Sequence, residues 1–293
     1  MKVILFIACA FAVYWFFFKK KKKTFEEYMA EGDAAEKEKN FEKALERYLK
    51  ATELKPESVE ARRKMGDMYY YAGKDEASIL SYKKVIELDP KSSYAYFMLG
   101  CAYQNVEKYA EAISSLQKVI DLSPDFKDAH KNLGETYMKV NKYDEAIHSF
   151  QKALSLDSKD FDIIPPLADA YYYFKKYNDA VRYFKKTLEI FGESAIYNYF
   201  LGNSYQGKGD IDEAIETYQK ALALDDKHED THFFMGSAYL QKGNYDKAIE
   251  CFKNVITLEP DAKVSDFRAE YENFVDEALL NEYFEKARTL SKK

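Results

Sequence analysis

The chain has 293 residues, more than one compact domain usually needs, but its 6 prolines and 11 glycines indicate no flexible linker. It contains 44 basic and 50 acidic residues, and no acidic residue occurs before Glu26, so the chain after residue 24 is net acidic and we expect no binding of nucleic acid. Its three cysteines lie in different regions without a CxxC pair, which argues against a disulfide framework and a zinc site.

Residues 3–18 form a run of sixteen uncharged, almost wholly apolar residues, and Lys19, Lys20, Lys21, Lys22 and Lys23 follow at once. As a helix, this run would be roughly 24 Å long, somewhat short of a bilayer core of about 30 Å, although flanking lysine side chains can extend to the membrane surface. A cleaved signal peptide needs its positive charge before the apolar run, whereas here the charge follows it.

The pattern therefore favours a retained transmembrane anchor with a polybasic flank over residues 1–24. The positive-inside rule then predicts a single-pass membrane protein with the remainder of the chain in the cytoplasm. The alternative is a cleaved signal peptide, which would make the protein periplasmic or secreted.

Residues 25–262 show a repeat of 34 residues without insertion. The segment NKYDEAIHSFQKALSLD begins at Asn141, and segments of the same pattern begin at Lys39, Gly73, Glu107, Lys175, Gly209 and Gly243. Its apolar residues recur at helical spacing, which predicts one amphipathic helix in each copy. A fixed period of this length indicates stacked units, here seven: 25–58, 59–92, 93–126, 127–160, 161–194, 195–228 and 229–262.

A second predicted helix precedes the amphipathic helix in each repeat, and it carries a small residue at one position. This residue is Gly32, Gly66, Gly100, Gly134, Ala168, Gly202 or Gly236, and a tyrosine follows three residues later in all repeats except the first. Glycine inside a helix costs about 1 kcal/mol relative to alanine, so its recurrence indicates close contact between helices. The amphipathic helix carries a small residue at one position, Ala44, Ser78, Ala112, Ala146, Ala180, Ala214 or Ala248, and a bulky residue four positions later: Tyr48, Tyr82, Leu116, Phe150, Phe184, Tyr218 or Phe252. Small and bulky residues at facing positions predict an interlocked pair of antiparallel helices.

These features, together with the prolines that close four repeats, resemble the tetratricopeptide repeat family over about four-fifths of the chain. The resemblance implies an all-α fold, a right-handed α-solenoid of seven helix-turn-helix units. It also implies that the first helices line a concave groove, which takes a peptide or a helix of a partner protein.

The fifth repeat departs from the pattern because Pro165 and Pro166 fall inside its first helix. Proline is tolerated only in the first turn of a helix, so we expect this helix to begin near Pro165. Residues 263–293 lack the pair of a glycine and a tyrosine three residues later that marks the repeats, but they keep apolar residues at helical spacing. This pattern predicts a C-terminal capping helical segment.

The resemblance places the second, fifth, ninth, twelfth and thirteenth positions of each repeat in the groove. The candidate groove residues are Arg63, Asp67, Tyr70, Tyr71, Tyr94, Phe97, Cys101, Gln104, Asn105, Lys131, Glu135, Met138, Asp169, Tyr172, Tyr173, Tyr199, Asn203, Gln206 and Phe233. Aromatic side chains among amides suit a peptide, because they offer apolar anchors and hydrogen bonds to its backbone.

No pattern in the sequence indicates a catalytic centre, a cofactor or a metal site, since the four histidines have no ligand spacing and no glycine-rich phosphate loop is present. We therefore expect no enzyme but a membrane-anchored scaffold that binds partner proteins and assembles complexes at the membrane. The alternatives are an exported protein of envelope assembly and a non-catalytic regulatory subunit of a partner enzyme.

Overall fold

The computed structural model describes residues 23–267 and 274–291. In this part of the chain it contains fifteen α-helices and two short 3-10 helices and no β-strand, in agreement with the predicted all-α repeat fold. The chain divides into two compact units, one up to Pro124 and the other from Asp125, which we call the N-terminal unit and the C-terminal unit.

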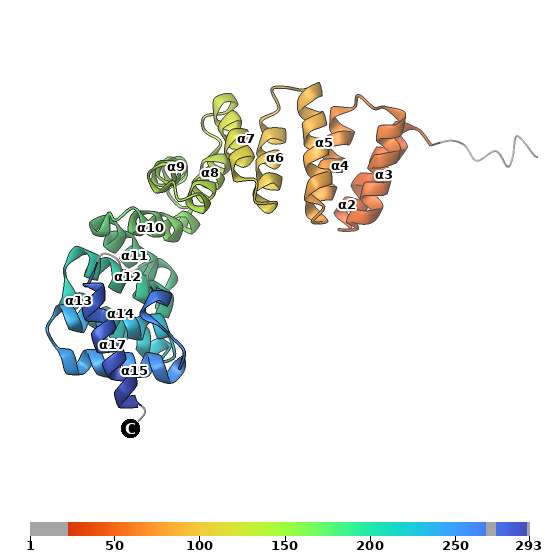
Figure 1. The fold of residues 1–293 in the computed structure, drawn as a ribbon. Helices are drawn as coiled ribbons and strands as arrows, with labels where there is room; N and C mark the ends of the chain where they lie inside the picture. Colours follow the sequence, from red (N-terminus) through yellow and green to blue (C-terminus); the bar gives the residue numbers. More distant parts are fainter. Residues whose placement is uncertain (1–22, 268–273, 292–293) are drawn as a thin grey trace, which may run out of the picture. The chain divides into compact units, whose positions relative to one another are not determined.

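The N-terminal unit contains repeats 1–3 as three helical hairpins side by side (Figure 1). Its helices are α2 (Phe25–Lys37), α3 (Phe41–Leu54), α4 (Val59–Tyr71), α5 (Asp75–Leu88), α6 (Ser93–Asn105) and α7 (Tyr109–Leu122). The two helices of each repeat contact each other, and α3 and α5 also contact the first helix of the next repeat. The amphipathic stripes of α3 and α5 are therefore covered from both sides.

Short polar side chains fix where the first helices of this unit begin. Thr24 and Glu27 form a capping box at the start of α2. Ser58 and Ser92 cap α4 and α6, because each hydroxyl accepts a hydrogen bond from the backbone N–H three residues later.

The C-terminal unit contains repeats 4–7 and a final helix. Its elements are α8 (Lys127–Lys139), α9 (Tyr143–Leu156), η1 (Phe161–Ile163), α10 (Ile164–Tyr173), α11 (Tyr177–Phe191), α12 (Ala195–Lys208), α13 (Ile211–Leu224), α14 (Glu229–Gln241), α15 (Tyr245–Leu258), η2 (Val264–Phe267) and α17 (Glu277–Ser291). The amphipathic helix α9 lies between α8 and α10, and its residues Ala146, Phe150 and Ala153 are fully buried.

A glycine in the first helix faces the bulky side chain of the second helix in six of the seven repeats. A Cβ atom added at Gly134 would lie 2.7 Å from the ring of Phe150, and one added at Gly202 would lie 2.5 Å from the ring of Tyr218. Real Cβ atoms do not approach another atom so closely, so the ring occupies the space that a side chain would need. The predicted interlocking of small and bulky residues is present, with the glycine as the small partner of the ring.

The turn between the two helices has the same backbone geometry in every repeat. Its left-handed residue is Lys39, Gly73, Glu107, Asn141, Lys175, Gly209 or Gly243. The next residue donates its N–H to the carbonyl five residues before it, as from Lys74 to Tyr69 at 2.9 Å. This shared geometry holds the two helices of each repeat at one mutual orientation.

The fifth repeat has the shortened first helix that its prolines predict. Residues Phe161–Ile163 form a 3-10 turn, and α10 follows with Pro165 and Pro166 in its first turn, where no N–H donor is needed. The helix has 10 residues, against 13 in the first helix of the fourth repeat.

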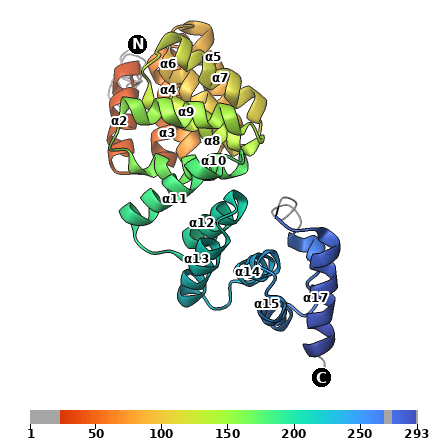
Figure 2. The ribbon, with the colours of Figure 1, turned by 90° about the vertical axis from the view of Figure 1, so that its left-hand side faces the viewer.

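In the predicted capping segment, Phe267 lies on the 3-10 helix η2, and α17 covers Glu277–Ser291. This helix packs beside α15 (Figure 2) and buries Leu280, Phe284 and Ala287 completely. Arg288 donates a hydrogen bond to the carbonyl of Pro260 at 2.6 Å and another to that of Ala262, which ties the end of the last repeat to α17.

The prediction of a single-pass membrane protein is corrected here. The described helices have 10 to 15 residues, or about 15–22 Å, which is well short of a bilayer core. Throughout residues 23–267 and 274–291, no helix is long and apolar enough to cross a membrane. The predicted anchor, residues 3–18 with the flanking lysines up to Lys22, lies outside the described residues. The right-handed sense of the superhelix is a separate point and remains a prediction.

Replacement of Gly134 by alanine tests the glycine–ring contact. Alanine favours the helix by about 1 kcal/mol, but the fully buried ring of Phe150 has no room to retreat, so we expect a net loss of about 1–3 kcal/mol in the free energy of unfolding. Thermal unfolding followed by circular dichroism measures this loss. The exposed Glu145→Ala in α9 serves as the control and should change little, and an equal stability of Gly134→Ala and the wild type would refute the close contact.

Candidate functional site

The first helices α4 and α6 contact each other in the N-terminal unit, and α12 contacts both α10 and α14 in the C-terminal unit. We call the side of each unit on which the first helices lie the first-helix face. In the N-terminal unit, the Tyr94 hydroxyl on α6 donates a hydrogen bond to Asp67 on α4 at 2.8 Å. In the C-terminal unit, the Asn203 amide on α12 donates to the hydroxyl of Tyr172 on α10 at 3.4 Å. All four residues are candidates from the sequence, and within each unit the structure brings them together in these pairs.

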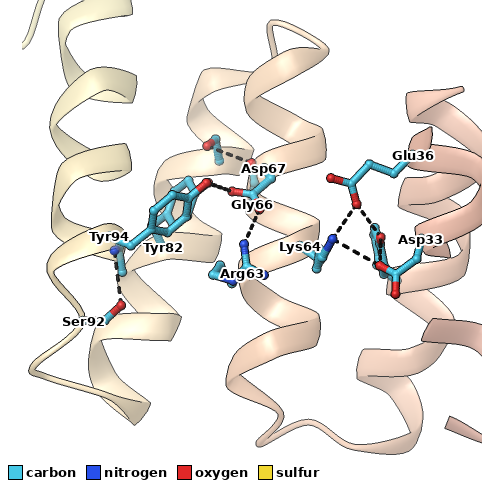
Figure 3. Close-up of polar contacts among 12 residues, drawn as sticks. Asp33, Glu36, Arg63, Lys64, Gly66, Asp67, Tyr82, Ser92 and Tyr94 are labelled. Carbon is cyan, nitrogen blue, oxygen red and sulfur yellow. Dashed lines mark hydrogen bonds and ion pairs between the residues drawn. The ribbon is translucent and has the colours of Figure 1, made fainter. Parts of the chain in front are cut away.

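Asp67 is the centre of a polar network on the N-terminal unit (Figure 3). Its carboxylate accepts hydrogen bonds from the hydroxyl groups of Tyr82 and Tyr94 and forms an ion pair with Arg63 at 2.9 Å. Asp67 is only 4% exposed, and its burial raises the pKa of the carboxyl group even though three donors surround it. These bonds hold the two rings and the guanidinium group in fixed positions.

A related cluster joins repeats 1 and 2 on the same face (Figure 3). The Tyr48 hydroxyl donates to Asp33 and to Glu36, each at 2.8 Å, and the Lys64 ammonium group bonds Glu36 at 2.7 Å and Asp33 at 3.2 Å. Burial acts to raise the pKa of Asp33, but the hydrogen bonds from Tyr48 and Lys64 outweigh it and leave the pKa lowered. The acidic groups of this cluster are thus already paired within the chain.

A tyrosine from the second helix supplies the donor in each of these clusters. The Tyr218 hydroxyl does the same in the sixth repeat, where it donates to Asn203 at 2.7 Å and to Gln206 at 2.9 Å. In each case the acceptor at the ninth position precedes the tyrosine by fifteen residues. A tyrosine in the core of the repeat therefore reaches the first-helix face with its hydroxyl group.

Repeats 4 and 5 lack this donor. Their second helices carry Phe150 and Phe184, while Glu135 and Asp169 occupy the ninth position. Among the described residues, neither carboxylate has a hydrogen bond or an ion pair within 4 Å. Both are half-buried, and burial raises the pKa of Asp169 to about 6. Burial also raises the pKa of Glu135, and the positive charges of Lys131 and Lys139 oppose this only in part.

Two exposed tyrosines at the thirteenth position are held by ring contacts with the preceding repeat. Tyr71 is 55% exposed and stacks on Phe41 with ring centres 5.6 Å apart. Tyr173 is 38% exposed and stacks on Tyr143 at 5.5 Å. This ring pairing is not among the predictions from the sequence, although aromatic residues at the seventeenth position of one repeat and the thirteenth position of the next are a signal for it.

The first-helix face of the last repeat is covered by the chain itself. Phe233, a candidate groove residue, is fully buried, and the ring of Phe267 stacks on it with centres 4.0 Å apart. Gln241 donates a hydrogen bond to the carbonyl of Phe274. Phe233 is therefore a packing residue in this structure. Tyr199 is also buried, with 4% exposure, and packs against Phe234.

The remaining candidates lie apart from these clusters. Tyr70, Phe97 and Gln104 are half-buried, and the ring of Tyr70 meets that of Tyr71 edge to face with centres 5.9 Å apart. The exposed Asn105 donates to the carboxylate of Asp75 at 2.9 Å. In the described part of the chain, no group of three or more histidine, cysteine, aspartate or glutamate side chains is arranged to hold a metal ion.

Replacement of Tyr82 by phenylalanine tests the network around Asp67. The variant keeps the ring in the core but removes one of three donors to a buried carboxylate, so we expect a loss of about 1–3 kcal/mol in the free energy of unfolding. Tyr137→Phe is the matched control, because the Tyr137 hydroxyl has no hydrogen bond to a described residue. Equal thermal stability of the two variants would contradict the role of this bond.

The raised pKa of Asp169 predicts that the stability of the fold depends on pH. Its pKa of about 6 in the folded protein exceeds the unfolded value near 3.9, so ionisation of Asp169 destabilises the fold above this range, and the cost disappears as the pH falls through it. We expect Asp169→Asn to raise the free energy of unfolding by about 2 kcal/mol near pH 7.5 and by much less near pH 4.5.

Melting temperatures of the wild type and the variant at both pH values measure this difference. The control is Asp162→Asn, which changes an exposed carboxylate of the same repeat. If the variant were more stable by the same amount at both pH values, the raised pKa of Asp169 would be contradicted.

Comparisons with known proteins agree with the repeat architecture. Family profiles described as tetratricopeptide repeat match residues 28–58, 93–126, 128–160, 166–229 and 205–271, and one described as TPR repeat matches 66–106. No curated protein matches the chain in sequence.

Solved structures show the same fold at low identity. The C-terminal part of a TPR repeat-containing protein from Cytophaga hutchinsonii has a TM-score of 0.64 at 20% identity, over 82% of this chain and 97% of that one. A tetratricopeptide repeat protein from Parabacteroides merdae has a TM-score of 0.57 at 15% identity, over 92% and 99% of the two chains.

A third structure, YrrB, is described as a TPR protein with an unusual peptide-binding site. It has a TM-score of 0.54 at 23% identity, over 61% of this chain and 93% of its own. The repeated hairpins and the family profiles lead to one conclusion: the chain belongs to the tetratricopeptide repeat proteins.

Proposed function

We propose that the chain is a non-catalytic binding protein that holds a peptide or a helix of a partner protein on the first-helix faces of its repeats. In this proposal residues 25–262 are the repeats that bind, and residues 263–293 close the last one. The shared fold with YrrB, whose description names a peptide-binding site, is consistent with this function.

The observation that carries the proposal is the exposed aromatic surface of the N-terminal unit. Tyr71 and Tyr94 are 55% and 36% exposed, so a large part of each side chain lies outside the core of the unit. Both rings are held in place, Tyr71 by the stack on Phe41 and Tyr94 by the hydrogen bond to Asp67. A rigid aromatic ring loses little conformational entropy on binding, so it is an effective anchor for a partner.

The polar residues beside these rings suit the backbone of a bound segment. Arg63 lies over the ring of Tyr94 at 5.4 Å, and Gln104 and Asn105 follow on α6. Guanidinium and amide groups donate hydrogen bonds to peptide carbonyls, which gives affinity without dependence on the partner's side chains. The face therefore combines apolar anchors with donors for the main chain.

A photo-crosslinking amino acid at position 71 of the full chain tests the proposal in the cell that makes the protein. We expect a covalent adduct with a partner protein at this position and none at position 80, where Leu80 is 69% exposed on the second helix α5. The Tyr71→Ala variant should weaken recovery of the same partner by about 5–30-fold, as loss of an aromatic anchor usually does. Adducts at both positions in equal yield, or at neither, would refute binding at the first-helix face.

A further inference from the structure

The first-helix faces differ in whether their acidic groups already have donors. In repeats 1 and 2, Asp33 and Asp67 are bonded by tyrosine hydroxyl groups and by Lys64 or Arg63. In repeat 7 the face is covered by Phe267. At the ninth position, only the fourth and fifth repeats present a half-buried carboxylate that has no donor among the described residues.

We propose that the first-helix faces of repeats 4 and 5 bind a basic segment of the partner, whose lysine or arginine side chains pair with Glu135 on one repeat and with Asp169 on the next. This inference rests on the proposed function, since it specifies the chemistry of the segment that the repeats hold.

The missing donor is a direct result of the core residues. Tyr48 and Tyr82 each reach the carboxylate fifteen residues earlier, whereas Phe150 and Phe184 stand in the same place without a hydroxyl group. A half-buried carboxylate without a hydrogen bond costs free energy, and a cation from outside removes this cost while it forms a charge-assisted bond. The charged groups near Glu135 are Lys131 and Lys139, which act on it only through space, and no charged group acts on Asp169.

Aromatic rings next to Asp169 suit the same ligand. Tyr172 and Tyr173 follow Asp169 by three and four residues on α10, so both lie on its side of the helix. Their rings meet edge to face with centres 5.2 Å apart, and Tyr173 is 38% exposed. A ring beside a carboxylate favours lysine or arginine, because the ring packs on the aliphatic stem and attracts the cation.

Peptide selection tests the proposal. A display library of random twelve-residue peptides is selected on the full chain and, in parallel, on the Glu135→Gln, Asp169→Asn double variant. We expect lysine and arginine to be enriched with the wild type and to lose that enrichment with the variant. Because Asp169→Asn is expected to stabilise the fold, a loss of binding cannot be attributed to unfolding.

An enriched peptide is then synthesised and titrated against each variant by fluorescence anisotropy. We expect the double variant to bind about tenfold more weakly or worse, as the loss of a partly buried charge pair does, and the control Glu189→Gln, an exposed position on α11, to bind as the wild type does. Replacement of the basic residue of the peptide by glutamine should weaken binding to the wild type by a similar factor. It should change the affinity for the double variant little.

Phe184→Tyr tests the argument without any change of charge. The new hydroxyl group stands fifteen residues after Asp169, as that of Tyr82 does after Asp67. It should therefore donate a hydrogen bond to the Asp169 carboxylate from within the chain. We expect this variant to lower the pKa of Asp169, measured by NMR titration, and to weaken binding of the basic peptide about as much as Asp169→Asn does.

The outcomes separate this inference from the proposed function. Enrichment of neutral or acidic peptides would overturn the basic segment and leave peptide binding intact, whereas selection of no peptide, with no adduct at position 71, would overturn both. Replacement of Lys19–Lys23 by glutamine should leave the affinity for the basic peptide unchanged. A gain in affinity would mean that the chain's own lysines occupy this face, and would overturn the assignment to a partner.

Discussion

The close approach of two helices at one glycine is the contact on which the rest of this structure depends. Where Gly66 meets Tyr82, or Gly134 meets Phe150, the ring lies against bare backbone, so the two helices of a repeat have one possible spacing. The common turn geometry fixes their orientation as well. Within each unit, hairpins of this common form pack on one another through the second helix of one repeat and the first helix of the next.

The same contact links the core to the surface. The ring that fills the space at the glycine points its far edge toward the first-helix face, so a single hydroxyl group decides whether the carboxylate there has a partner. Tyr82 bonds Asp67, but Phe184 leaves Asp169 without a donor. A change from tyrosine to phenylalanine, which alters the side-chain volume very little, thus changes the chemistry of the first-helix face while the ring stays in the core.

Much of the fold could be predicted from the sequence, because the 34-residue period and the pattern of Gly134 and Phe150 report contacts within one hairpin, and Pro165 reports where a helix begins. The covering of Phe233 by Phe267 could not, since it joins residues of different elements outside the period. The donor from Tyr82 to Asp67 was missed for another reason: its ring is required by the core, and nothing in the pattern shows that its hydroxyl group has a second role.

The helix α17 lies on the side of α15 where an eighth hairpin would otherwise stack, and Arg288 fastens it to the backbone at Pro260 and Ala262. Its buried residues Leu280, Phe284 and Ala287 occupy the apolar area that a further copy of the hairpin would need. The face of α15 that a further hairpin would cover is therefore already occupied by a helix that does not belong to the repeats.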